Sequence, residues 1–203
     1  LRKLEYRGYD SAGLAALFPQ KLGQIKTEKT VGYVSELVSK VNGRFNGSHI
    51  SIGHTRWATH GKVNDTNAHP HSSKDGKITV VHNGIIENSS LLSENLIEDG
   101  YIFNSETDTE VIVHLLDSEL ESQNGKKNHL LAFTRVISQL EGSWAIAVIM
   151  TDLEGILISK NGAPMVIGRG VNTLSVSSDV QPFYGACSEV SYMQDGDNFL
   201  LTK

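Results

Sequence analysis

The chain has 203 residues, of which 39% are hydrophobic, and carries a net charge of −5 with a pI of about 5.9. This length suits one large domain or two small ones, and the apolar content is too high for a disordered chain. The sequence has no block of Lys and Arg to bind nucleic acid, and no apolar run near the roughly 20 residues that cross a membrane. The single cysteine, Cys187, excludes an internal disulfide, as expected of a cytoplasmic protein.

The chain is predicted to begin inside a helix. Residues 1–6 have the composition of the last turns of a helix, and Gly8 ends it. We therefore expect a fragment whose natural N-terminus precedes Leu1. In the following part, the pattern predicts a buried strand at 11–18, a helix at 31–41 and strands at 49–55 and 78–82.

The middle of the chain is predicted to be helical. Residues 88–99 form one helix, with Gly100 after its C-terminus. Thr107 and Glu110 have the spacing of a capping box, which would start a second helix running to about residue 121. A third helix is predicted at 129–140.

The remaining residues are predicted to form short strands separated by Gly, Asp and Asn, a pattern typical of antiparallel hairpins. The expected strands are 144–151, 155–159, 165–167, 173–177, 189–193 and 198–202. The elements together predict an α+β fold of mostly antiparallel sheets, with the helices gathered in the middle of the chain.

Four polar segments, 5–13, 54–61 followed by 67–71, 82–88 and 105–110, hold the candidate functional residues. Asn83 and Gly84 follow a hydrophobic strand. An Asn amide beside a Gly backbone N–H can form an oxyanion hole, but Asn-Gly is also the commonest hairpin turn. Both interpretations remain open at this point.

Three further side chains have a functional and a structural interpretation. The planar guanidinium of Arg56 suits a carboxylate, but arginines more often form surface ion pairs. Asp108 could bind an ammonium group, or it could stabilise the first turn of the capped helix. Trp57 could close over a ligand, or it could pack in a core or interface.

The histidines of the second and third segments raise the question of a metal site. His54, His60, His69, His71 and His82 lie close together in the sequence. No His-Glu-x-x-His motif or cysteine pair accompanies them, so no metal site is predicted. A histidine-rich metalloprotein stays as an alternative class.

The four segments resemble class II, N-terminal-nucleophile glutamine amidotransferases. They read RGYDSAG at 7–13, HTRWATHG at 54–61, HNGIIEN at 82–88 and SETDTE at 105–110. The first and last of these are closest to the sugar-phosphate aminotransferase branch of the family. The resemblance extends to residues 177–179 and 196–197 and thus covers nearly the whole chain.

The resemblance implies a four-layer α/β/β/α sandwich, no cofactor, and L-glutamine as substrate. Arg56 would bind its α-carboxylate and Asp108 its α-ammonium. Asn83 and Gly84 would form the oxyanion hole. The remaining implied roles are Thr59, His60 and Gly61 lining the pocket, Trp57 on a closing loop, Arg7 beside the nucleophile and His69 near the hinge.

In this family the nucleophile is the first residue of the mature chain, a cysteine whose own α-amine is the general base. It would precede Leu1, and Cys187 would be a small apolar filler. A sugar-phosphate isomerase domain of the same native chain would use the ammonia, and the native protein would be a homodimer. The alternative is a non-catalytic glutamine-binding regulatory module.

Overall fold

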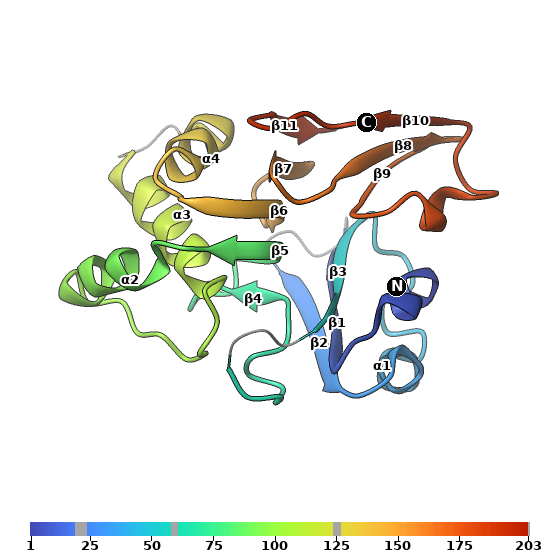
Figure 1. The fold of residues 1–203 in the computed structure, drawn as a ribbon, viewed down its shortest axis with the longest axis horizontal. Helices are drawn as coiled ribbons and strands as arrows, with labels where there is room; N and C mark the ends of the chain where they lie inside the picture. The colour runs from blue at the N-terminus through green and yellow to red at the C-terminus, as the bar shows by residue number, and fades with distance from the viewer. Residues whose placement is uncertain (19–23, 58–60, 124–126, 203) are drawn as a thin grey trace.

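The computed structural model describes residues 1–18, 24–57, 61–123 and 127–202. It has the α+β architecture expected from the sequence, with every strand pair antiparallel among these residues. The described strands form one five-stranded and two three-stranded sheets. Figure 1 shows α2, α3 and α4 together on one side of the molecule and α1 on the opposite side.

The five-stranded sheet, in the order β11-β7-β6-β5-β4, is the centre of the molecule. Its strands are β4 (His71–Ser72), β5 (Ile78–Ile86), β6 (Gly142–Met150), β7 (Ile156–Asn161) and β11 (Asn198–Leu201). On one face, alternate residues such as Val80 and Ile146 pack against the helices α2 (Ser89–Glu98), α3 (Glu110–Ser122) and α4 (His129–Ile137).

The other face of this sheet packs against the second layer of strands. Val81 and Ala147 meet Ala15, Ile52 and Met165, which come from or lie beside the three-stranded sheets. One of these sheets has the order β2-β1-β3 and the other β10-β8-β9. Their strands are β1 (Ser11–Leu17), β2 (Ile25–Val31), β3 (Ile50–Arg56), β8 (Val166–Gly170), β9 (Thr173–Ser177) and β10 (Glu189–Tyr192).

A smaller helical layer covers the outer face of β1. Ala12 packs against Val34 and Leu37 of α1 (Val34–Val41), and Leu1 and Leu14 join this cluster. The layers therefore run helix, sheet, sheet, helix, because the central sheet and the sheet of β1 carry apolar side chains on both faces. This is the four-layer α/β/β/α sandwich that the resemblance implies.

Three local predictions need correction. Residues 2–7 form a short 3-10 helix, η1 (Arg2–Arg7), rather than the end of an α-helix. The predicted helix at 31–41 begins only at Val34, and Val31 belongs to β2, a strand that the sequence pattern does not predict. The two-residue β4 is also unpredicted, whereas the later strands agree with the prediction to within a few residues.

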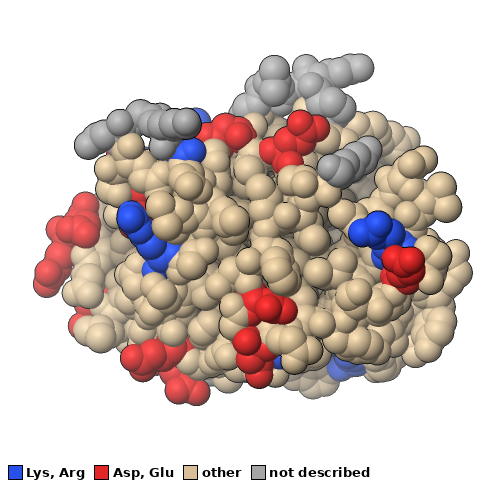
Figure 2. Space-filling model, turned by 90° about the horizontal axis from the view of Figure 1, so that it is seen from above, with Lys and Arg blue, Asp and Glu red and all other residues tan. Residues whose placement is uncertain are grey.

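The surface shows no dominant charge of one sign on the face in Figure 2, where acidic and basic side chains of the described residues are scattered singly and in small groups. None of the helices in the described ranges is long and apolar enough to cross a membrane.

Candidate functional site

Asn83 and Gly84 lie inside β5, and the hairpin-turn interpretation is wrong. The strand continues to Ile86, and Asn83 is paired with Ala145 and Gly84 with Trp144 of β6. Gly84 has a φ of 128°, a value that residues with a Cβ rarely adopt. The strand therefore contains a glycine-dependent irregularity directly after Asn83.

Gly84→Ala is expected to destabilise the protein. A Cβ at this position would lie 2.1 Å from the backbone oxygen of Ser143, so the pairing of β5 with β6 must open. The strained φ alone costs about 1–3 kcal/mol, and each 1 kcal/mol lowers Tm by about 2–4 °C in a chain of this size. Gly100→Ala is the matched control, because Gly100 has a φ of 91° with no atom within 4 Å of a Cβ. Equal Tm losses for the two variants in calorimetry would contradict the clash.

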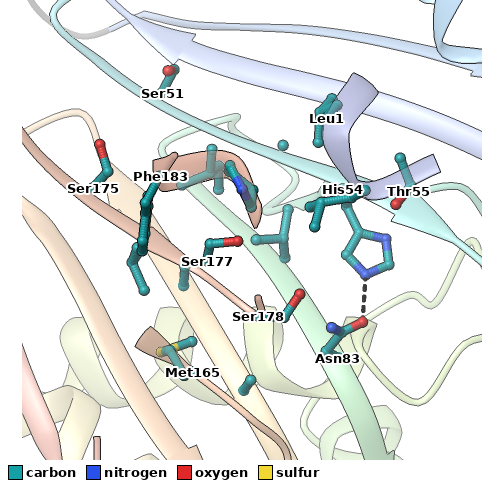
Figure 3. A pocket seen from close by; sticks show the side chains of 18 of the residues that line it. Leu1, Ser51, His54, Thr55, Asn83, Met165, Ser175, Ser177, Ser178 and Phe183 are labelled. Carbon is teal, nitrogen blue, oxygen red and sulfur yellow. Dashed lines mark hydrogen bonds between the residues drawn. The ribbon is translucent and has the colours of Figure 1, made fainter. Parts of the chain in front are cut away.

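A cavity of about 400 Å³ lies next to Asn83 (Figure 3). Its lining includes His54 and Thr55 of β3, Asn83 of β5, and Ser175 and Ser177 of β9. A second cavity of about 950 Å³ continues between β3 and β9. In the described topology, each of these two strands is the edge strand of its sheet. The cavities therefore separate two sheet edges that have backbone groups available for pairing.

Asn83 contacts one member of a group of histidines, in which His54 is half-buried and His69 and His82 are buried. The Nε2 atom of His54 lies 3.1 Å from the Oδ1 atom of Asn83. The His54 ring packs against His69 with 4.2 Å between ring centroids. Thr109 Oγ1 lies 2.9 Å from His69 Nε2 and 3.0 Å from His82 Nδ1. One threonine hydroxyl thus connects two of these rings.

These histidines are neutral at physiological pH. Burial lowers the pKa of His54 to about 4 and that of His71 to about 3, and it lowers the pKa of His69 and His82 as well. The described residues contain no group of three His, Cys, Asp or Glu side chains that could hold a metal ion. Neutral rings act here as hydrogen-bonding groups in a region of low polarity.

Arg56 is the last residue of β3, and it is buried rather than on the surface, with 5% of its area exposed. Its Nη1 atom lies 3.8 Å from Asp10 Oδ1 and donates to the backbone oxygen of Lys62 at 3.5 Å. A buried guanidinium requires compensating negative partners. The surface ion-pair interpretation of Arg56 is therefore wrong.

The capping box at Thr107 is also wrong. Helix α3 begins at Glu110. The Glu110 carboxylate accepts hydrogen bonds from the backbone N–H groups of Asn104 and Ser105 and from the Ser105 hydroxyl. Burial alone would raise the pKa of Glu110, but His114 nearby and these bonds lower it to about 2. Glu110 therefore anchors the loop before the helix instead of capping the helix.

Asp108 lies in that loop, outside the helix. Its Oδ2 atom accepts a hydrogen bond from the backbone N–H of Ile86 at 2.8 Å, at the end of β5. Asp108 directly precedes Thr109, the N-cap residue of α3, so it lies before the first turn of the helix and not within it. The structure places Asp108 against the strand that carries Asn83 and Gly84.

The loops after Arg56 and before α3 are joined by Glu106. Its Oε2 atom accepts from the backbone N–H of Lys62 at 3.0 Å and from Asn67 Nδ2 at 2.9 Å. Asn67 Oδ1 in turn accepts from the backbone N–H of Glu106 at 2.9 Å. Gly61 lies against this junction, where a Cβ would be 3.0 Å from Asn67 Nδ2. The segment after Arg56 and the loop that carries Asp108 are thus held together.

Trp57 is on the surface, with 66% of its area exposed, which excludes core packing. Its ring lies over Gly8, where φ is 86° and a Cβ would be 1.8 Å from a ring carbon, so a larger residue would strain the backbone and displace the ring. The neighbouring Arg7 donates a hydrogen bond to the Ser178 hydroxyl at 2.8 Å and lines the 400 Å³ cavity. His69, by contrast, is buried among residues of this chain.

The candidate residues are brought together only in part. Asn83 and Arg7 line the 400 Å³ cavity, but Arg56, Trp57, Gly61, Gly84 and Asp108 do not. Thr59 and His60 lie outside the described residues.

The sequence-based interpretation did not identify some residues of the site. It gave no role to Thr109 or Glu106, and it considered His54 only as a metal ligand. For His54 a signal was present, because it shares the inward face of its strand with Ile52. The contacts of Thr109 and Glu106 are with distant parts of the chain, which no local pattern indicates.

Known proteins resemble this chain over its whole length. Residues 54–185 match a glutamine amidotransferase domain family. The chain is 46% identical over 209 residues to an isomerizing glutamine–fructose-6-phosphate aminotransferase of Methanosarcina mazei, and 42% identical over 204 residues to that of Pyrococcus horikoshii. Each match covers 100% of this chain and 33% of the relative. The chain thus spans about a third of the length of these relatives.

Solved structures show the same fold. A glutamine phosphoribosylpyrophosphate amidotransferase from B. subtilis, complexed with ADP and GMP, superimposes with a TM-score of 0.78 at 23% identity, covering 99% of this chain and 43% of that one. A class-II glutamine aminotransferase domain protein from Silicibacter pomeroyi gives a TM-score of 0.61 at 15% identity, covering 92% of this chain and 84% of that one.

Proposed function

Because this chain belongs to the glutamine amidotransferase domain family, we propose that it is the glutamine-hydrolysing domain of a glutamine–fructose-6-phosphate aminotransferase. The observation that carries the proposal is Asn83 followed by Gly84 in β5, beside a cavity and next to the loop of Asp108. The native protein would pass ammonia from glutamine to a sugar-phosphate isomerase domain that follows this one, and would be a cytoplasmic homodimer. The identity to relatives of that name supports this assignment.

The nucleophile in this proposal is a cysteine that precedes Leu1, with its own α-amine as general base. Cys187 lines the cavity but cannot do this chemistry in the same way, because its backbone nitrogen is an amide that donates to Phe183 at 3.0 Å. The facing edges of β3 and β9 would accept a further strand, which would bring its end beside Asn83.

The remaining residues bind a zwitterionic amino acid. Arg56 takes the α-carboxylate through its planar fork and Asp108 takes the α-ammonium. Thr59, His60 and Gly61 line the pocket, and Arg7 lies close to the nucleophile. Trp57 lies on the loop that closes over glutamine, which its exposed position next to Gly8 supports. His69 lies towards the hinge with the isomerase domain.

The reaction follows from these positions. The thiolate attacks the side-chain amide carbon of glutamine, and the resulting oxyanion accepts hydrogen bonds from the Asn83 amide and the Gly84 backbone N–H. The protonated α-amine gives its proton to the leaving nitrogen, so ammonia departs and a thioester forms. Water then attacks the thioester, which releases glutamate and restores the thiol.

The test compares residues 1–203 with the native protein that includes its N-terminal cysteine. We expect glutamate release from glutamine only in the native protein, and loss of that activity when the N-terminal cysteine is changed to alanine. Adding fructose 6-phosphate should yield glucosamine 6-phosphate.

Three outcomes would contradict the proposal. Glutamate release by residues 1–203 that disappears in Cys187→Ala would make Cys187 the nucleophile. A native protein that binds glutamine in calorimetry without hydrolysing it would instead be a non-catalytic regulatory module. Zinc or another metal found by elemental analysis, and needed for glutamate release, would favour the metalloprotein alternative.

A further inference from the structure

We infer that His54 is a positioning residue, which fixes the side-chain amide of Asn83 so that its NH2 group is directed towards the reacting carbonyl. This inference rests on the proposed function, in which that NH2 group stabilises the oxyanion. An amide can be turned over to present either its oxygen or its nitrogen. Only one of these two orientations can donate to an oxyanion.

The contact that decides the orientation is between His54 and Asn83. His54 Nε2 lies 3.1 Å from Asn83 Oδ1 (dashed in Figure 3). Because the amide oxygen accepts this bond, the amide nitrogen is left on the side away from His54, as Figure 3 shows. Both residues line the 400 Å³ cavity, and Asn83 lies where the further strand would bring its end.

The tautomer of His54 makes this ring nitrogen a donor rather than an acceptor. Within the described part of the chain, the buried Nδ1 atom of His54 has no hydrogen-bond partner. A buried N–H without an acceptor costs more than a bare ring nitrogen, so the proton belongs on Nε2, where Asn83 accepts it. The lowered pKa of His54, about 4 because of burial, keeps this neutral form through the physiological range. An Nδ1–H tautomer would turn the Asn83 amide over and aim its oxygen at the oxyanion.

The His54 ring is itself held in place by a neighbouring histidine. His69 packs against His54 at 4.2 Å between centroids and is bonded to Thr109, which also bonds His82, the residue before Asn83. The His54–Asn83 bond joins β3 to β5, which belong to different sheets and share no backbone pairing among the described strands. The orientation of Asn83 is therefore set by the second sheet and not by its own strand.

The test uses the native enzyme with its N-terminal cysteine. In His54→Leu the donor is lost, and we expect kcat for glutamine hydrolysis to fall about tenfold or more, with KM changed less than about threefold. His54→Gln keeps an N–H near the place of Nε2 and should restore most of kcat. His129→Leu removes a histidine that bonds Asp152 and does not line the cavity, and it should leave kcat unchanged.

A double-mutant cycle distinguishes positioning from mere stability. In an Asn83→Ala background, His54→Leu should have no further effect on kcat, because the amide that it orients is gone. The inference would be overturned if the losses in kcat were additive in this cycle, if His54→Gln did not restore kcat, or if kcat were unchanged in His54→Leu. Failure of the proposed function is a different result, since the wild-type enzyme would then release no glutamate.

Discussion

Asn83→Ala in the native enzyme is expected to lower kcat for glutamine hydrolysis by about 10²–10³, with little change in KM. The loss of one preorganised oxyanion donor typically has this size, about 2.7–4 kcal/mol, because the negative charge develops only in the transition state. Asn83 is suited to this role because β5 and His54 hold it beside the cavity. Steady-state kinetics of glutamate release measure both constants.

The matched control for this variant is Asn88→Ala. Asn88 follows β5 and bonds the backbone of Gln139 and Glu141, but it lies at the start of α2 and does not line the cavity. Its replacement should lower Tm and leave kcat unchanged. A large rise in KM with normal kcat in Asn83→Ala would show that Asn83 contacts the ground state and does not stabilise an oxyanion.

Arg56→Lys is expected to raise KM for glutamine at least about tenfold, although the charge is retained. A hydrogen bond to a charged group contributes about 1.5–3 kcal/mol, and lysine loses the fork that binds both carboxylate oxygens. Arg44→Lys is the control, because Arg44 forms an exposed pair with Glu28 at 2.8 Å. That variant should leave KM unchanged.

Asp108→Asn tests the other end of the same zwitterion. The asparagine oxygen can still accept from the Ile86 N–H, so the loop keeps its anchor, while the charge that would face the ammonium is lost. KM should rise while calorimetric Tm scarcely changes. The Arg44→Lys control is measured alongside both variants. If Arg56→Lys and Asp108→Asn both have a normal KM, then Arg56 and Asp108 do not bind the substrate.

The fold could be predicted well where hydrophobic pattern and burial coincide. Residues 144–150 are apolar throughout and form most of the buried strand β6, since both of its faces are covered. Strand β2 escaped prediction because Lys26, Glu28 and Lys29 interrupt its pattern, and only Thr30 in it is buried. A strand that is half exposed and charged carries little signal in the sequence.

The sequence indicates which residues form the candidate site, but it does not indicate how those residues are arranged locally. Asn83-Gly84 has the sequence of a turn, and only its pairing with Ala145 and Trp144, on a strand that follows three helices later, makes it part of a sheet. Glu110 has the spacing of a capping residue but bonds the preceding loop instead. Such contacts override local preferences, and a single sequence does not contain them.

The second layer of strands is assembled from the two ends of the chain, and this has a consequence for biosynthesis. The sheet of β1, β2 and β3 leaves the ribosome before the other described sheets, and Ala15 and Ile52 are not fully covered until β5, β6 and β7 have been made. Folding during synthesis proceeds from the N-terminus, and uncovered apolar faces favour aggregation in the meantime. His54 can meet Asn83 early, whereas Arg7 meets Ser178 only after β9 has emerged. Until β9 has emerged, the cavity beside Asn83 would therefore lack the wall that Ser175 and Ser177 provide.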